Sequence, residues 1–258
     1  MKILLTNDDG IYAPGLAAME CALRRLGEVC VVAPAVEQSG VGHSITFLMP
    51  LMAKEIFDGE RRRGWAVEGS PADCIKLALS EFWPQPDLVV SGINGGLNLG
   101  INVLYSGTVA GATEGAVFGI PSIAVSLEYD EHAQFDRAAE MALCLIEQIL
   151  RRDGADKHAL YNINIPTVAL QRPAEVRVVP MATVGWPAEF DRRVDPKGRR
   201  YFWAMGSLTV PTAGEMTDLD AWSKGFITLT PLRIDRTETA MLERMHDWNL
   251  SLEPKERC

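Results

Sequence analysis

The chain has 258 residues, of which 47% are hydrophobic and 23% charged, and its formal net charge is −9. This composition is typical of a globular protein and excludes a disordered, collagen-like or low-complexity chain. Because an acidic surface repels polyanions, we expect neither polymeric nucleic acid nor a membrane as a partner. No apolar run reaches about 18 residues, the length that would indicate a membrane-spanning helix.

The cysteines and histidines limit the chemistry. The five cysteines are odd in number and none has C-x-x-C spacing, which favours a reducing cytoplasm over a disulfide framework or a zinc knuckle. The N-terminus turns acidic too early for a signal peptide, so we expect a cytoplasmic protein. The four histidines are scattered, without H-E-x-x-H. A bound metal would therefore have mostly oxygen ligands, as Mg²⁺, Mn²⁺ or Ca²⁺ prefer.

Strands and helices alternate over the first 166 residues. The apolar pattern predicts strands at 2–6, 28–33, 45–57, 64–67, 87–91, 122–126 and 160–165, and helices at 14–26, 108–118, 135–152 and from Ser70 onward. A strand, a helix and a second strand within about 33 residues form a βαβ unit with a right-handed crossover. The pattern predicts an α/β fold built on a doubly wound, mostly parallel sheet, with residues 1–166 as its catalytic core.

The chain changes character after Pro166. Residues 167–258 are predicted to form a C-terminal extension, with a short helix at 217–224, a strand at 226–230 and a last helix at 238–248. Residues 186–206 combine charged and aromatic residues around an Asp-Pro-Lys-Gly turn, which predicts a β-hairpin. Because exposed aromatic patches usually contact a partner, we interpret this hairpin as an oligomerisation arm rather than a simple surface hairpin.

Polar, glycine-rich loops follow three of the predicted strands. In an open α/β sheet, ligands bind beyond the carboxyl ends of the strands, so these loops should meet at one edge. The first contains Asp8 and Asp9, the second Ser39 and the third Asn94. An Asp-Asp-Gly turn alone is more often a helix cap, but two adjacent carboxylates at this edge favour a divalent cation. A hydroxyl and an amide oxygen would complete its shell.

An anion site is predicted where the third loop enters the next helix. The Ser106 and Thr108 hydroxyls, with backbone N–H groups at the helix start, can hold an anion, although an ordinary helix cap explains them equally well. The chain has no Walker A loop, no G-x-G-x-x-G and no G-x-S-x-G elbow. A cation beside an anion site indicates hydrolysis of phosphomonoesters, with an Asp as proton acceptor.

Six ordered motifs resemble the SurE family of stationary-phase survival proteins. They are T-N-D-D-G at 6–10, S-G-x-G-H-S-I-T at 39–46, G-S-P-A-D-C at 69–74, S-G-I-N-x-G-x-N-x-G at 91–100, Y-S-G-T-V at 105–109 and E-G-x-x-x-G-I-P-S-I-A at 114–124. N-I-N-I-P at 162–166 and T-D-x-x-A-x-x-x-G at 217–225 extend the resemblance almost to the C-terminus.

The resemblance implies a Rossmann-like core, C-terminal elements exchanged between subunits of a homodimer or homotetramer, and a 5′-nucleotidase. The implied activity is hydrolysis of nucleoside 5′-monophosphates, often also of 3′-monophosphates and sometimes of polyphosphate. One divalent cation per subunit, Mg²⁺ or Mn²⁺ with Ca²⁺ as a substitute in crystals, is implied. The implied residues are Asp8, Asp9, Ser39 and Asn94 for the metal, Ser106, Gly107 and Thr108 for phosphate, and Asn7 and Asn98 for the pocket.

Our hypothesis from the sequence is a metal-dependent phosphomonoesterase in which Asp8 or Asp9 is the catalytic base. One alternative is a phosphatase with an aspartyl-phosphate intermediate, which would need D-x-D where this chain has D-D-G. The other is a nucleotide-binding regulator without activity, which would leave the two acids unexplained. Base preference, the 5′ to 3′ ratio, the physiological metal and the choice between dimer and tetramer stay open.

Overall fold

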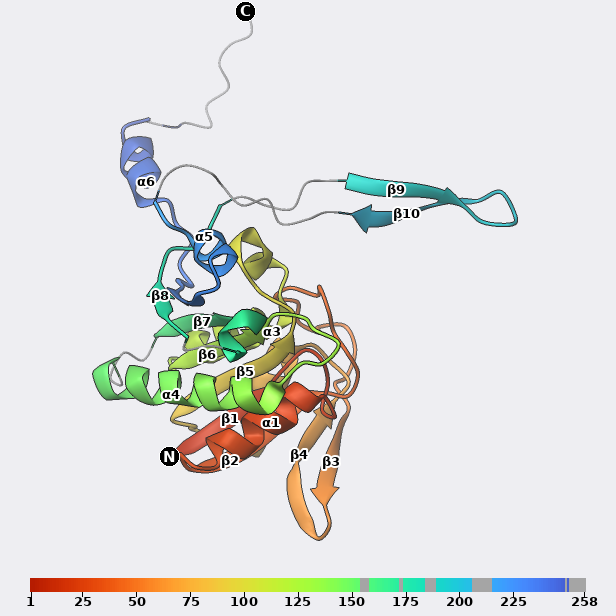
Figure 1. Ribbon diagram of the computed structural model, residues 1–258, viewed down its shortest axis with the longest axis vertical. Coiled ribbons are helices and arrows are strands. Elements are labelled where there is room, and N and C mark those ends of the chain that lie inside the picture. The colour runs from red at the N-terminus through yellow and green to blue at the C-terminus, as the bar shows by residue number, and fades with distance from the viewer. Residues whose placement is uncertain (154–157, 172–173, 184–188, 206–214, 249, 251–258) are drawn as a thin grey trace, which may run out of the picture.

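A nine-stranded sheet forms the centre of the protein in the computed structural model, which describes residues 1–153, 158–171, 174–183, 189–205, 215–248 and 250 (Figure 1). Its strand order is β3-β4-β2-β1-β5-β6-β7-β11-β8. The strands are β1 Lys2–Thr6, β2 Glu28–Pro34, β3 Ala53–Asp58, β4 Arg61–Val67, β5 Leu88–Gly95, β6 Ser122–Leu127, β7 Leu160–Ile165, β8 Val176–Val178 and β11 Ile227–Pro231.

The core of the sheet is parallel and doubly wound, as predicted. Strands β4, β2, β1, β5, β6 and β7 pair in parallel, whereas β3 runs antiparallel to β4. The chain leaves β1 for β2 on one side and reaches β5 on the other, so the order reverses between β1 and β5. Ligands bind at such switch points because the two following loops diverge there.

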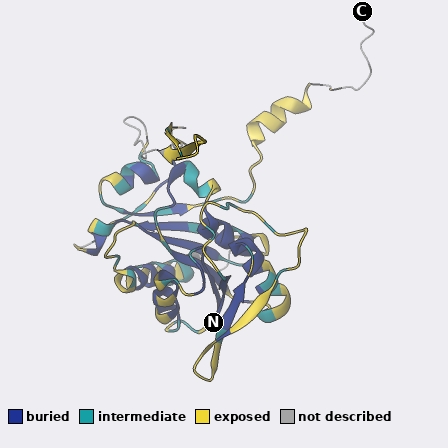
Figure 2. Ribbon diagram, turned by 90° about the vertical axis from the view of Figure 1, so that its right-hand side faces the viewer, coloured by how far each residue is buried: buried dark blue, intermediate teal, exposed yellow. Residues whose placement is uncertain are grey.

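Helices cover both faces of the sheet. They are α1 Pro14–Leu23, α2 Pro71–Leu77, α3 Gly107–Val117, α4 Phe135–Asp153, α5 Asp218–Ser223 and α6 Thr239–His246. α1 and α4 pack together over one face, and α2 and α3 pack together over the other. Figure 2 shows the sheet as buried and α6 as exposed. None of the helices in the described part of the chain has the length and apolar character needed to cross a bilayer.

Several predicted elements have different bounds in the structure. The strand expected at 64–67 begins at Arg61, and the strand expected at 87–91 continues to Gly95. The strand expected at 45–57 begins only at Ala53, because residues 43–46 contact the start of α2 instead of a neighbouring strand. Pro50 also lacks the N–H that a strand would need at that point. The helix expected at 14–26 ends at Leu23, and β8 was not predicted because three residues carry too little pattern.

Buried Asp73 joins the loop after Ser39 to α2. Its carboxylate accepts hydrogen bonds from the Thr46 N–H (2.9 Å), the Thr46 hydroxyl (2.8 Å) and the Ser70 N–H (3.0 Å), while the Ser70 hydroxyl caps the helix. This reciprocal capping satisfies donors that a helix start otherwise leaves unpaired. The second polar loop is thereby fixed to the body of the fold.

The C-terminal extension contributes strands to the same sheet. β11 pairs antiparallel with β7 and parallel with β8, so it lies between two strands that precede it in the chain. The hairpin of β9 Glu189–Val194 and β10 Arg200–Met205 projects from the body (Figure 1), and residues 186–188 and 206 of the predicted arm lie outside the described residues. A domain boundary at residue 166 stays a prediction.

We predict that Asp73→Asn lowers the free energy of unfolding by about 2 kcal/mol, because an amide offers one acceptor where three donors converge. Denaturant unfolding measures this change. Asp58→Asn, which removes the same charge from the exposed end of β3, is the control and should stay within about 0.5 kcal/mol of the parent. Equal effects of the two substitutions would contradict the anchoring role of Asp73.

Candidate active site

The four predicted metal ligands line one cavity of about 440 Å³ at the switch point of the sheet. Asp8 and Asp9 follow β1, Ser39 follows β2, and Asn94 lies near the end of β5. They meet because parallel strands end at the same edge of the sheet. The structure thus brings together residues up to 86 positions apart, while their roles stay predictions.

Asp8 lies deepest in the cavity wall and is only 5% exposed. Its Oδ1 accepts a hydrogen bond from the Thr108 hydroxyl at the start of α3. Burial raises the pKa of Asp8 from 3.8 to about 6; the Thr108 hydrogen bonds lower it and the neighbouring charge of Asp9 raises it. Asp8 is therefore a carboxyl group whose ionised form lacks a neutralising partner among the described residues.

Each of the other three candidate ligands already forms a hydrogen bond within the protein. Asp9 Oδ2 accepts from the Gly95 N–H at 3.1 Å, and burial raises the pKa of Asp9. The Ser39 hydroxyl donates to Glu37 Oε1 at 2.6 Å. The Asn94 amide N–H donates to the Gly96 carbonyl at 2.6 Å, so this hydrogen bond does not use the side-chain oxygen Oδ1.

The cavity wall therefore presents acceptor oxygens and negative charge. Three carboxylates line it, those of Asp8, Asp9 and Glu37, and none of its described lining residues is Lys, Arg or His. A hard divalent cation fits this set, since it binds carboxylate, hydroxyl and amide oxygens together. No cluster of three or more His, Cys, Asp or Glu residues suited to a metal occurs among the described residues, so neutral oxygens would have to complete the shell.

The predicted phosphate residues Ser106, Gly107 and Thr108 form the start of α3. Ser106 lines the cavity, and its oxygen caps the helix by accepting from the Val109 N–H at 3.1 Å. Thr108 is fully buried and donates to Asp8. A Cβ atom at Gly107 would lie 2.8 Å from Asp8 Cβ, so only glycine permits this approach. Their contact with phosphate stays a prediction.

Asn7 and Asn98 differ in position. Asn98 lines the cavity; its amide donates to Ser126 Oγ at 2.8 Å, and its carbonyl accepts from the Asn162 amide of β7 at 2.8 Å. Asn7 is fully buried outside the lining and donates to the Gly10 carbonyl at 3.0 Å, which shapes the turn that carries the two acids.

Sequence reasoning missed Glu37, Asn102 and Tyr105, which also line the cavity. Glu37 lies two residues before Ser39, and a third acid in a loop at the same edge was the available signal. Asn102 lies in the short 3₁₀ turn Gly100–Leu104, and Tyr105 follows it. This turn has no apolar pattern from which its orientation could have been predicted.

Comparison with known proteins gives consistent matches over nearly the whole chain. The family model described as "Survival protein SurE" matches residues 3–187. A protein from Rhodopirellula baltica named 5′-nucleotidase SurE is 54% identical over 252 residues, which cover 97% of this chain and 99% of that protein. A relative of the same name from Heliobacterium modesticaldum is 42% identical, with 96% and 92% covered. The crystal structure of the SurE protein from Aquifex aeolicus matches with a TM-score of 0.83 and 36% identity, covering 95% of this chain and 98% of that one.

We predict that Asp8→Asn stabilises the protein at pH 8 without divalent cations. The pKa of Asp8 is higher in the folded than in the unfolded chain, so its protonation stabilises the fold below pH 4, and this stabilisation is lost as the pH rises through about 6. The variant should gain about 2 kcal/mol of unfolding free energy at pH 8 and almost nothing at pH 4. Denaturant unfolding at both values tests this, with exposed Glu60→Gln as control. A gain that does not depend on pH would contradict it.

Proposed function

The chain belongs to the SurE family, and we propose that it is a divalent-metal-dependent 5′-nucleotidase that releases phosphate from nucleoside 5′-monophosphates. The observation that carries this proposal is the acceptor-lined cavity at the switch point, where three carboxylates face no cationic side chain among the described lining residues. A phosphate dianion could not enter such a cavity unless a cation were present. The names of the relatives support the choice of nucleotide substrate.

We assign one Mg²⁺ or Mn²⁺ per subunit to Asp8, Asp9, Ser39 and Asn94. When bound, the ion would neutralise phosphate charge and lower the pKa of a water molecule. Ser39 and Asn94 suit this role because each donates a hydrogen to the protein, to Glu37 and Gly96, and keeps its side-chain oxygen available to a cation.

The two acids differ in what they can do. Asp8 is held by Thr108 and is almost fully buried, so it serves as a fixed ligand. Asp9 is partly exposed, with Oδ2 held by Gly95, so its other oxygen can accept the proton of the attacking water. Ser106 lies at the N-terminus of α3, where its hydroxyl and the helix dipole favour the phosphate anion.

We further propose that 3′-monophosphates and polyphosphate are secondary substrates, because the residues assigned to the cation and the phosphate would serve all of these substrates. The free thiols of Cys21, Cys30, Cys74 and Cys144 support a cytoplasmic location, since a reducing compartment preserves them. No polymeric nucleic acid or membrane is proposed as a partner, given the net charge of −9.

We predict that the protein releases phosphate from adenosine monophosphate only with a divalent cation. A chelator should abolish release and added Mg²⁺ or Mn²⁺ should restore it. Asp8→Asn should lower kcat by about 100- to 10,000-fold, because it removes a ligand charge and leaves the fold intact. A colorimetric phosphate assay measures both effects.

Thermal unfolding supplies the matched control for this experiment. Mn²⁺ should raise the melting temperature of the parent and of exposed Asp58→Asn, but not of Asp8→Asn. Phosphate release that persists in excess chelator, or nucleotide binding without release, would reject the proposed activity and favour a regulator. A trapped phosphoenzyme would instead favour the aspartyl-phosphate mechanism.

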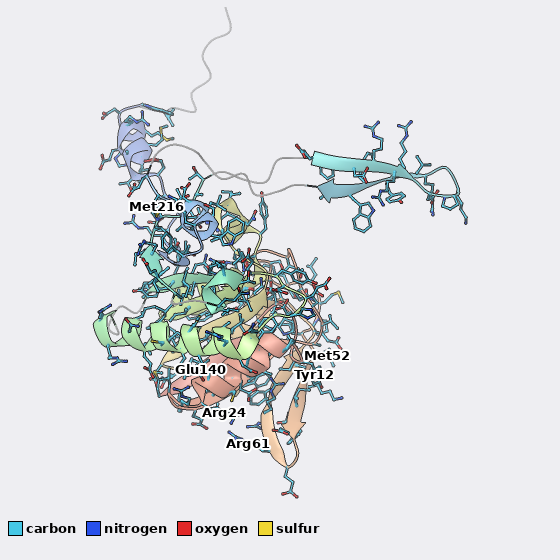
Figure 3. All side chains as sticks on the ribbon, in the orientation of Figure 1. Tyr12, Arg24, Met52, Arg61, Glu140 and Met216 are labelled. Carbon is cyan, nitrogen blue, oxygen red and sulfur yellow. The ribbon has the colours of Figure 1, made fainter. Side chains whose placement is uncertain are left out.

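We also propose that the β9–β10 hairpin mediates a homodimer or homotetramer, with C-terminal elements exchanged between subunits. Figure 3 shows its side chains standing clear of the body. Phe190, Phe202 and Trp203 are 62%, 54% and 59% exposed, and they lie on both faces of the hairpin. A two-stranded hairpin is marginally stable alone, so a partner chain would stabilise these aromatic surfaces.

We predict that the double substitution Phe202→Ser and Trp203→Ser reduces the oligomeric state, as measured by size-exclusion chromatography with light scattering. Removal of two large apolar contacts from an interface commonly weakens association by about 2 kcal/mol or more. Arg61→Ala, on the separate β3–β4 hairpin labelled in Figure 3, is the control and should not change assembly. Unchanged mass in the double variant would refute the arm as an interface.

A further inference from the structure

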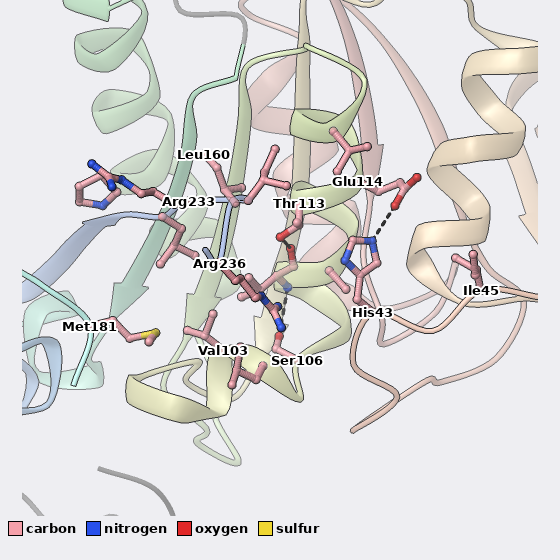
Figure 4. Close-up of a pocket in the computed structure, with 17 residues that line it drawn as sticks. His43, Ile45, Val103, Ser106, Thr113, Glu114, Leu160, Met181, Arg233 and Arg236 are labelled. Carbon is pink, nitrogen blue, oxygen red and sulfur yellow. Dashed lines mark hydrogen bonds and ion pairs between the residues drawn. The ribbon is translucent and has the colours of Figure 1, made fainter. Parts of the chain in front are cut away.

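A second and larger pocket adjoins the catalytic cavity. It has a volume of about 720 Å³, and Ser106 belongs to the lining of both. Figure 4 shows its walls, formed by the loop that carries His43, by α3 and by the segment that follows β11. Its size lies within the range of small-molecule sites.

The walls of this pocket combine apolar and cationic side chains. Val103, Leu160 and Ile234 provide apolar surface, whereas Arg233 and Arg236 provide positive charge. Neither arginine forms an ion pair with a described residue, although the charge of Arg233 stabilises the ionised carboxylate of nearby Asp235. In the view of Figure 4 the Arg236 side chain runs toward Ser106. Apolar walls beside guanidinium groups suit a flat aromatic ring, which packs on the former and stacks on the latter.

His43 lines the larger pocket, where hydrogen bonds hold both its ring and the main chain next to it. Its main chain is held because the preceding Gly42 donates its N–H to the Tyr105 carbonyl at 2.9 Å. Its ring is held because Nε2 lies 2.6 Å from Glu114 Oε2, and Lys76 binds the other oxygen of Glu114 at 3.0 Å. Nδ1 is then the remaining polar atom of the ring, and it is available to a ligand hydroxyl.

A different neighbour of the catalytic cavity is less suitable. A pocket of about 360 Å³ contains Tyr129 and joins the cavity at Asp9, Glu37 and Gly95. Phosphoryl transfer is in line, so the leaving group departs away from the attacking water. If the water lies against the Asp9 carboxylate, the leaving nucleoside cannot lie on that same wall. The pocket reached past Ser106 satisfies this constraint.

We infer that the pocket lined by His43, Arg233 and Arg236 binds the nucleoside part of the substrate, with the ribose hydroxyls near His43 and the base between Arg236 and the apolar wall. This inference rests on the proposed nucleotidase activity and adds the subsite that separates nucleotides from simpler phosphate esters. His43 and Arg236 are thus specificity-determining residues.

Product inhibition of the full-length enzyme tests the subsite. We expect both products to inhibit hydrolysis of adenosine monophosphate, inorganic phosphate through the catalytic cavity and adenosine through the adjoining pocket. Arg236→Ala and His43→Ala should each raise the inhibition constant for adenosine and KM for the nucleotide by about tenfold. The inhibition constant for phosphate should change by less than about twofold.

Three further measurements decide the outcome. Arg61→Ala removes an equal charge elsewhere and should leave both constants unchanged. Tyr129→Ala should also leave adenosine inhibition unchanged; a loss in this variant alone would overturn the inference and place the nucleoside in the smaller pocket. If Arg236→Ala weakened inhibition by tripolyphosphate but left inhibition by adenosine unchanged, the pocket would be an anion subsite and the inference would be overturned. Absence of phosphate release by the parent enzyme would reject the proposed function itself.

Discussion

The contact between Asp8 and the start of α3 is the constraint on which the candidate site depends. It connects the end of β1 to a helix that begins about 100 residues later, through the hydrogen bond from Thr108. The contact requires glycine at position 107, since a Cβ there would overlap Asp8. Because the helix start is held against β1, Ser106 is brought to the wall of the same cavity. One close approach therefore positions both Asp8 and the helix start that we propose for the phosphate.

This arrangement has an electrostatic consequence. The N-terminus of α3 faces an acidic side chain, so part of its favourable dipole is already used within the protein. Burial nevertheless keeps the pKa of Asp8 raised, which shows that one helix start and one hydroxyl do not offset the loss of water. A bound cation would neutralise the negative charge of Asp8 that the protein itself leaves uncompensated. If the proposed ion binds at the cavity and supplies positive charge there, an acidic protein can act on an anionic substrate without a large basic surface.

The sequence predicted the sheet and the four candidate ligands for one physical reason. Buried parallel strands have clear apolar runs, and their carboxyl ends share an edge, so polar residues after them could be grouped before any contact was known. Every parallel core strand of the doubly wound sheet was predicted, although the ranges predicted for β4 (64–67) and β5 (87–91) were too short. The strand predicted at 45–57 began before β3 does. The role of Thr108 could not be predicted, because a hydroxyl at a helix start serves equally well as a cap, a phosphate ligand or a partner of Asp8. Glu37 was missed since its direction is set by Ser39, a contact that has no periodic signature.

The place of β11 links the C-terminal extension to the chemistry of the core. Because β11 pairs with β7, the chain that follows it passes along α3 and carries Arg233 and Arg236 to the pocket beside Ser106. The same segment leads on to exposed α6, beyond the projecting hairpin in sequence. The residues proposed for the nucleoside, Arg233 and Arg236, therefore lie between a strand fixed by the core and the exposed helix α6. If α6 is exchanged between subunits as proposed, its movement would act on the loop at 232–236, and the proposed assembly would then be coupled to the proposed nucleoside pocket.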